Sequence, residues 1–152
     1  LGASFPISAC IGSEAAMQAW ARGGEVVHTS THAGAPIGCA AALATLNEVA
    51  SRGLARRART LGERLLTELR RALAGAPAVV DVRGRGLITG IELRDGPLGL
   101  ATARKLLERG YLVTVGGRAG EVIVLTPPLT IAEPILLSVV PELRELLESV
   151  GA

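Results

Sequence analysis

Hydrophobic and charged residues alternate at helical spacing through the middle of the chain. Between residues 54 and 75, apolar side chains recur three or four positions apart, with arginine and glutamate between them. This spacing places the apolar side chains on one side of an α-helix, so it predicts a long amphipathic helix. Its apolar set is Leu54, Ala58, Leu61, Leu65, Leu66, Leu69 and Leu73.

The apolar runs that follow predict a small sheet. Residues 78–93 hold two runs of β-type residues with glycines between and within them, which indicates paired strands or one bent strand. Further strands are predicted at residues 111–117 and 121–129, and further helices at residues 97–110 and 132–151. Pro141 predicts a kink or a restart in the last helix, because its ring disrupts a helix interior. The whole order predicts an α+β domain with helices packed on a small sheet.

The first part of the chain does not continue this pattern. An apolar run at residues 5–13 predicts a buried strand, and a short helix follows with Ser13 as its N-cap and Gly23–Gly24 as its end. Pro36 suits the first turn of the next helix, because its missing N–H would have no partner there. An Ala- and Leu-rich run carries that helix on to about Ser51. The predicted plan is a terminal piece of another domain at residues 1–35, a connecting helix at 36–53 and a small α+β domain at 54–152.

The composition fits a folded domain with an aliphatic core. Of the 152 residues, 49% are hydrophobic and only 2% are aromatic, so the core must consist mainly of Ala, Leu, Val and Ile. The net charge of +2 is too small to indicate nucleic acid, and the arginines have the spacing of a solvated helix face. No signal peptide or membrane-length apolar run is present, so we expect a cytoplasmic protein with no membrane partner.

Few side chains in the sequence carry obvious chemistry. Cys10 and Cys39 stand among apolar residues and are interpreted as small buried side chains, and no spacing predicts a metal site. His28 and His32 are acid–base candidates, but no carboxylate stands at a diagnostic spacing from either, so a role in the loop is favoured.

The polar run His28–His32 comes just before the helix that begins at Pro36. A helix N-terminus carries unpaired N–H groups and partial positive charge. Hydroxyl groups beside it either cap those N–H groups or join them in holding an anion, of which phosphate is the usual one. For Thr31 and Ser30 the residues alone leave both interpretations open.

Four stretches together resemble the class III aminotransferases, which are fold-type-I enzymes that use pyridoxal 5'-phosphate (PLP). They are LGASFPISACIGS at residues 1–13, HTSTHAGAPIGCAAALATL at 28–46, VRGRGLITGIEL at 82–93 and VIVLTPPLTI at 122–131. Their order and the gaps between them also match, and the resemblance runs from Leu1 to about Leu147.

The resemblance implies a fold, a reaction that uses PLP, and an assembly. The fold is the C-terminal small α+β domain of a fold-type-I enzyme, with a connecting helix and a terminal piece of the large domain. The reaction moves an amino group from an amine or amino acid to an oxo-acid. The assembly is a homodimer with active sites at the interface, in which Thr31, with Ser30 beside it, reaches the phosphate of PLP in the other subunit.

The lysine that binds PLP as a Schiff base is expected two positions before Leu1, so no catalytic residue is assigned in this chain. A start at Leu1 rather than Met suggests a fragment. The one lysine present, Lys105, belongs to an amphipathic helix and is expected on the surface. The chain by itself is therefore predicted to be inactive, because the chemistry needs an activated amine.

Two further positions depart from the family pattern. Many relatives have an arginine at the place of Val124, where its bidentate fork holds a substrate carboxylate. Ala35 stands where the family usually has asparagine. Arg83, in the family's R-G-x-G motif, either fixes a turn or lies at the substrate entrance.

These departures leave other functions open. A PLP-dependent amino-acid racemase or epimerase of the same fold would use the same cofactor without net amino transfer. A non-catalytic α+β interaction module would explain the missing lysine.

Overall fold

The structure is a computed structural model that describes residues 1–18 and 30–148. It divides into two compact units, Leu1–Arg52 and Gly53–Ala152, and each is described here by itself. The finer division at residues 35 and 53 stays a prediction.

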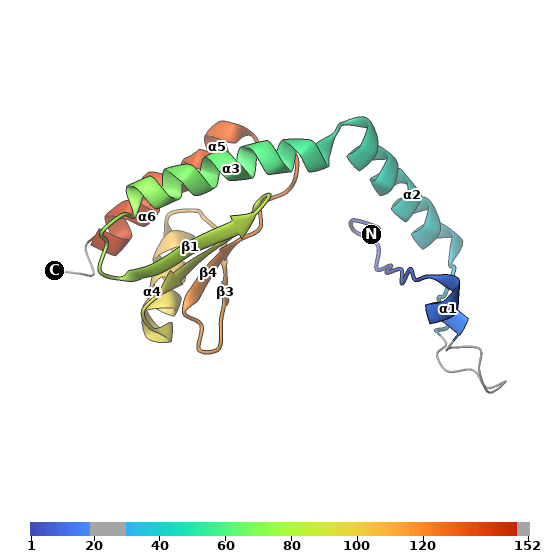
Figure 1. Ribbon diagram of the computed structural model, residues 1–152, viewed down its shortest axis with the longest axis horizontal. Helices are drawn as coiled ribbons and strands as arrows, with labels where there is room; N and C mark the ends of the chain where they lie inside the picture. The colour runs from blue at the N-terminus through green and yellow to red at the C-terminus, as the bar shows by residue number, and fades with distance from the viewer. Residues whose placement is uncertain (19–29, 149–152) are drawn as a thin grey trace. The chain divides into compact units, whose positions relative to one another are not determined.

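The first unit contains two helices, α1 (Glu14–Met17) and α2 (Pro36–Ser51) (Figure 1). Ser13 is the N-cap of α1, as predicted, and its hydroxyl accepts a hydrogen bond from the Ala16 amide at 3.4 Å. Pro36 is the first residue of α2, also as predicted. The predicted end of the short helix at Gly23–Gly24 lies outside the described residues.

The predicted buried strand at residues 5–13 is wrong. Phe5 makes one isolated bridge with Gly2, and no strand follows it among the described residues of this unit. The prediction that Cys10 and Cys39 are buried is also wrong, since both thiols are exposed. The physical reason is the same for both, because the described part of this unit has almost no interior. Its buried residues are Gly2, Gly38 and Ala42.

The second unit is an α+β fold, as predicted (Figure 1). Its helices are α3 (Leu54–Ala72), α4 (Gly96–Glu108), α5 (Glu133–Leu137) and α6 (Val139–Glu148). Its strands are β1 (Val79–Arg85), β2 (Ile88–Leu93), β3 (Thr114–Gly116) and β4 (Val122–Leu125). The strands form one antiparallel sheet in the order β1-β2-β4-β3. No helix in the described part of the chain is long and apolar enough to cross a membrane.

One aliphatic core lies between the helices and the sheet. Helix α6 contacts both α3 and α4, and α3 runs along β1 (Figure 1). The largest fully buried hydrophobic side chains are Leu65, Leu69, Ile91, Leu93, Leu106, Ile123, Leu143 and Leu147. The buried hydrophobic residues of this core, within the described ranges, are all Ala, Leu, Ile or Val, which confirms the prediction from composition. Of the apolar set predicted for this helix, Leu66 is partly buried at the edge of the core and Leu54 is buried outside it. The others belong to the core: Ala58, Leu61, Leu65, Leu69 and Leu73.

The predicted interruption of the last helix is present, and it lies just before Pro141. Helix α5 ends at Leu137, Ser138 forms a turn, and α6 begins at Val139. A proline ring collides with the carbonyl group four residues earlier, which here belongs to Leu137. The chain therefore breaks at Ser138 and places Pro141 in the first turn of a new helix, where the missing N–H costs little.

Strand register defines a second face of the sheet, opposite the face on which the described helices form the core. Side chains alternate between the two faces of a strand, and paired residues in neighbouring strands share a face. Val82, Ile91 and Ile123 pair in one row and face the core. The neighbouring row, Arg83, Gly90 and Val124 with Thr114, therefore lies on the opposite face, here called the open face.

One buried polar group gives a testable prediction about stability. Thr89 on β2 is fully buried, and its hydroxyl has no hydrogen-bond partner among the described residues. Replacing Thr89 by valine keeps the shape and removes the unpaired hydroxyl, so we expect stability to rise by about 1–3 kcal/mol. Urea unfolding followed by circular dichroism measures this. A variant less stable than the wild type would show that the hydroxyl has a partner, such as a buried water.

Candidate functional site

The loop before α2 holds the two residues predicted to contact phosphate. Ser30 and Thr31 are both exposed. The Ala33 amide donates to the Ser30 carbonyl at 3.0 Å, and the Ala35 amide donates to the His32 carbonyl at 3.1 Å. The backbone, and not the hydroxyls, therefore closes the turns of this loop.

No side chain caps α2. Its N-cap is Ala35, which has no hydroxyl or carboxyl to offer, and Ser30 and Thr31 do not replace it. The first helical hydrogen bond from an amide joins Cys39 to the Ala35 carbonyl at 3.0 Å. The amides of Ile37 and Gly38 lie in the first turn of α2, where backbone N–H groups have no acceptor within the helix.

The donors of this loop fit an anionic group. The first turn of α2 contains no acidic residue that would repel one. The hydroxyls of Ser30 and Thr31 make no hydrogen bond with the described residues and remain available. Whether they contact phosphate stays a prediction. His32 is exposed in the same loop, whereas His28 lies outside the described residues.

In the second unit, Arg83 is held across β1 and β2. Its guanidinium donates to Asp81 at 3.0 Å and also to Glu92 on the neighbouring strand. These bonds raise the pKa of Arg83, with the hydrogen bond to Glu92 as the largest cause and that to Asp81 next. A guanidinium with two carboxylate partners ties the strands together, which favours the structural interpretation of this residue.

A hollow of about 390 Å³ lies on the open face beside Arg83. It is lined by Arg83, Gly84, Arg85, Ile88, Gly90 and Val124. Val124 is half-buried in β4 and pairs with Gly90, which has no side chain to fill the space. A Cβ at Gly90 would lie 3.2 Å from Val122 Cγ1, so even a methyl group would be tight here.

Arg85 differs from Arg83 at this hollow. It is exposed at the end of β1, and it has no hydrogen bond or ion pair with any described residue. The sequence singled out Val124 but not Arg85 or Gly90. Alternation along β1 places Arg85 on the same face as Arg83, and that signal could have found it.

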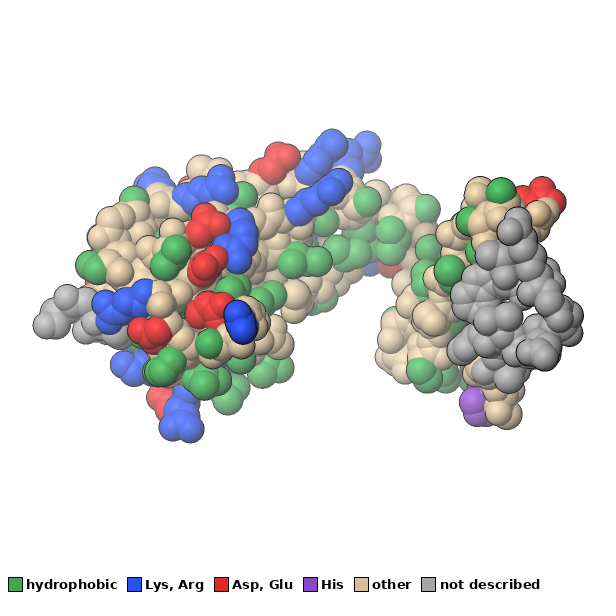
Figure 2. Space-filling model, turned by 60° about the horizontal axis from the view of Figure 1, so that its bottom comes forward, with side chains coloured by type: hydrophobic (Ala, Val, Ile, Leu, Met, Phe, Trp, Pro, Cys, Tyr) green, Lys and Arg blue, Asp and Glu red, His purple; other side chains and the backbone are tan. Residues whose placement is uncertain are grey.

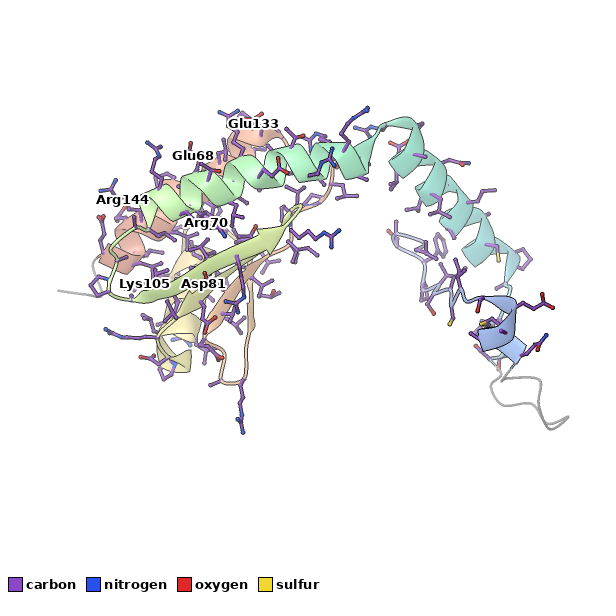
Figure 3. All side chains as sticks on the ribbon, in the orientation of Figure 1. Glu68, Arg70, Asp81, Lys105, Glu133 and Arg144 are labelled. Atoms are coloured by element: carbon purple, nitrogen blue, oxygen red, sulfur yellow. The ribbon has the colours of Figure 1, made fainter. Side chains whose placement is uncertain are left out.

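Lys105 does not belong to either site. It is exposed in the last turn of α4, as predicted (Figure 3). Over the second unit, acidic and basic side chains are intermixed, and hydrophobic side chains reach the surface between them (Figure 2). In the described ranges no group of three His, Cys, Asp or Glu side chains could hold a metal ion.

A second hollow, of about 420 Å³, lies between β3, β4 and α5 and is mainly apolar. Tyr111 is its one titratable side chain, and the Tyr111 hydroxyl donates to Ser138 Oγ at 2.9 Å. This hollow could therefore hold an apolar group, but its lining offers few side chains for catalysis or for binding a charged ligand.

Comparison with known proteins decides the family. A family model described as "Aminotransferase class-III" matches residues 1–147. The chain belongs to the class-III aminotransferases. The expectation drawn from the four motifs is thereby confirmed.

Curated class-III relatives match almost the whole chain. The putrescine aminotransferase of Pectobacterium atrosepticum is 34% identical over 151 residues, which cover 99% of this chain and 32% of that protein. The acetylornithine aminotransferase of Mycobacterium tuberculosis is 42% identical over 158 residues, which cover 100% of this chain and 36% of that protein. The chain thus spans about a third of the length of the curated relatives it matches.

Solved structures of aminotransferases share the fold. The acetylornithine aminotransferase of Elizabethkingia anophelis has a TM-score of 0.72 and 32% identity, covering 80% of this chain and 31% of that one. A Bacillus anthracis aminotransferase has a TM-score of 0.75 and 28% identity, covering 81% and 30%. The chain therefore shares its fold with solved aminotransferases.

Proposed function

We propose that the full-length protein is a PLP-dependent class-III aminotransferase that moves an amino group from an amine or amino acid to an oxo-acid. The match of the family to residues 1–147 carries this proposal. We propose further that it acts as a homodimer with active sites at the interface. In that assembly, this chain contributes phosphate contacts to the partner subunit's cofactor and one wall of the substrate pocket.

In this proposal, Thr31 and Ser30 hold the phosphate of PLP together with the first turn of α2. Free hydroxyls, unpaired amides and the absence of acid in that turn support the assignment. When bound, PLP supplies an aldehyde and an electron sink for moving a proton at the amino-bearing carbon. The chain's own role is to orient the phosphate and to shield part of the site from water.

The second unit supplies the substrate-facing wall. The open face with Val124 and its hollow offers both space and charge. The names of the relatives include both a diamine, putrescine, and an amino acid, acetylornithine. The proposal for the donor therefore covers amines and amino acids.

A product assay on the full-length protein tests the proposed function. With PLP, an amino donor and an oxo-acid, we expect the acceptor to gain the amino group and the donor to become a carbonyl compound. Inversion of the donor without any need for an oxo-acid would replace this proposal by a racemase or epimerase. Absence of both reactions would favour a non-catalytic module.

The 152-residue chain serves as the internal control. Its only lysine is Lys105, exposed on α4, so we expect no activity and no PLP adduct that borohydride can trap. Mass spectrometry after reduction measures the adduct. A strong adduct on Lys105 would contradict our assignment of this residue to the plain surface.

A further inference from the structure

Arg85 lies at the edge of the open face and has no partner for its charge in the part of the chain that the structure describes. Arg83, two residues earlier on the same strand and the same face, is bonded to both Asp81 and Glu92. Arg85 has no such carboxylate among the described residues. A free guanidinium keeps its full capacity for a bidentate bond to a planar anion.

The hollow beside Arg85 has a lining that suits a ligand with both an apolar part and a negative charge. Ile88, Gly90 and Val124 give it an apolar floor, and Arg85 stands at its rim. No carboxylate lines it. A ligand with an apolar chain and a carboxylate would cover the floor and meet the free cation at the same time.

A neighbouring hollow of about 460 Å³ also borders Arg85 but suits an anion less well. It lies between α3 and the β1–β2 turn, and Arg59 and Glu63 line it as well. The Glu63 carboxylate would repel an anion there, and so it lowers the affinity that two arginines would otherwise give. No carboxylate lines the hollow at Val124, since Asp81 and Glu92 are bonded to Arg83 and are not part of its lining.

We propose that Arg85 binds the carboxylate of the substrate in the hollow formed with Val124, and so determines specificity for amino acids over simple amines. This inference rests on the proposed function, because it names the substrate class of the same site. Arg85 is a specificity-determining residue here and takes no part in bond breaking.

The test compares two donors on the full-length protein. Ornithine and putrescine are diamines that differ only by a carboxylate. For Arg85→Gln we expect kcat/KM for ornithine to fall about 10- to 100-fold, through KM, with little change for putrescine. Arg85→Lys keeps the charge but loses the fork, so it should recover part of the loss. Arg118→Gln, an exposed position in the β3–β4 turn, is the matched control and should change neither donor.

An equal effect of Arg85→Gln on both donors, or no effect on ornithine, would overturn the inference. A second measurement separates it from the proposed function. Valerate, a carboxylate with an apolar chain and no amino group, should bind the full-length protein in isothermal titration and should lose at least 10-fold in affinity with Arg85→Gln. If no donor reacts but valerate binding depends on Arg85, the proposed function fails and the carboxylate site stands. If valerate does not bind, or binds both proteins equally, the site is refuted.

Discussion

Replacing Gly62 by alanine is expected to destabilise the second unit by about 3 kcal/mol. Gly62 lies in the middle of α3, where it faces the turn between β1 and β2. A Cβ at this position would overlap the carbonyl group of Gly86 and would lie 3.0 Å from the Gly86 Cα. Because the obstacle is backbone and not a flexible side chain, the helix and the turn must move apart.

The sign of this effect is what makes it informative. In an exposed helix, glycine to alanine stabilises by about 1 kcal/mol, because alanine has the higher helix propensity. Urea unfolding of the chain, followed by circular dichroism, measures the difference. Thr60→Ala, at an exposed position of the same helix, is the control and should change stability by less than about 0.5 kcal/mol. If Gly62→Ala were as stable as the wild type, the close approach of α3 to Gly86 would be refuted.

The contact also matters for the open face. Gly86 has a φ of +58°, a left-handed conformation that favours glycine, and it turns the chain between Arg85 and Ile88. Packing of α3 against this turn therefore fixes where β1 ends. A substitution that separates the two should disturb the hollow at Val124 as well as the stability.

Local patterns made most of the second unit predictable. The spacing of Leu61, Leu65 and Leu69 specifies one helix face, and it needs no knowledge of the rest of the chain. The glycine-containing run at residues 78–93 likewise holds both strands of one pair, because β1 and β2 form a hairpin with a two-residue turn. Where a segment supplies its own hydrogen-bond partners, the sequence is a sufficient guide.

The failed prediction at residues 5–13 has the opposite cause. A strand exists only where a neighbouring strand accepts its hydrogen bonds, and an apolar run does not say whether such a neighbour is present. The same limit applies to Cys10 and Cys39, whose burial depends on what packs against them. Alternation of residues along one strand predicts which side chains share a face, but it does not predict which other elements pack against that face.

The hollow at Val124 shows this limit at a functional site. Arg85 and Val124 are far apart in sequence and meet only because β2 lies between β1 and β4. That strand order follows from the packing of the whole unit. The family motifs single out Val124, whereas Arg85 is found beside the same hollow only from the pairing register of the strands.

If the proposed function holds, replacing Thr31 by alanine in the full-length protein is expected to weaken PLP binding about 10- to 150-fold. The proposal places the Thr31 hydroxyl on the cofactor phosphate, and a hydrogen bond to a charged group is worth about 1.5–3 kcal/mol. Neither Thr31 nor Ser30 caps α2, whose N-cap is Ala35, so loss of the hydroxyl should leave the helix intact. The dissociation constant of PLP, measured by fluorescence titration, should rise while the unfolding midpoint of the apoprotein stays unchanged.

Two further variants separate phosphate contact from a general loss of a hydroxyl. Thr31→Ser keeps the hydroxyl and should retain most of the PLP affinity. Thr45→Ala removes a hydroxyl that donates to the Ala41 carbonyl at 2.9 Å within α2, and it should not affect PLP. If Thr31→Ala left PLP affinity unchanged, the hydroxyl would serve the loop alone. The proposed phosphate contact by Thr31 would then be refuted, and only Ser30 and the uncapped start of α2 would be left to test as the phosphate site.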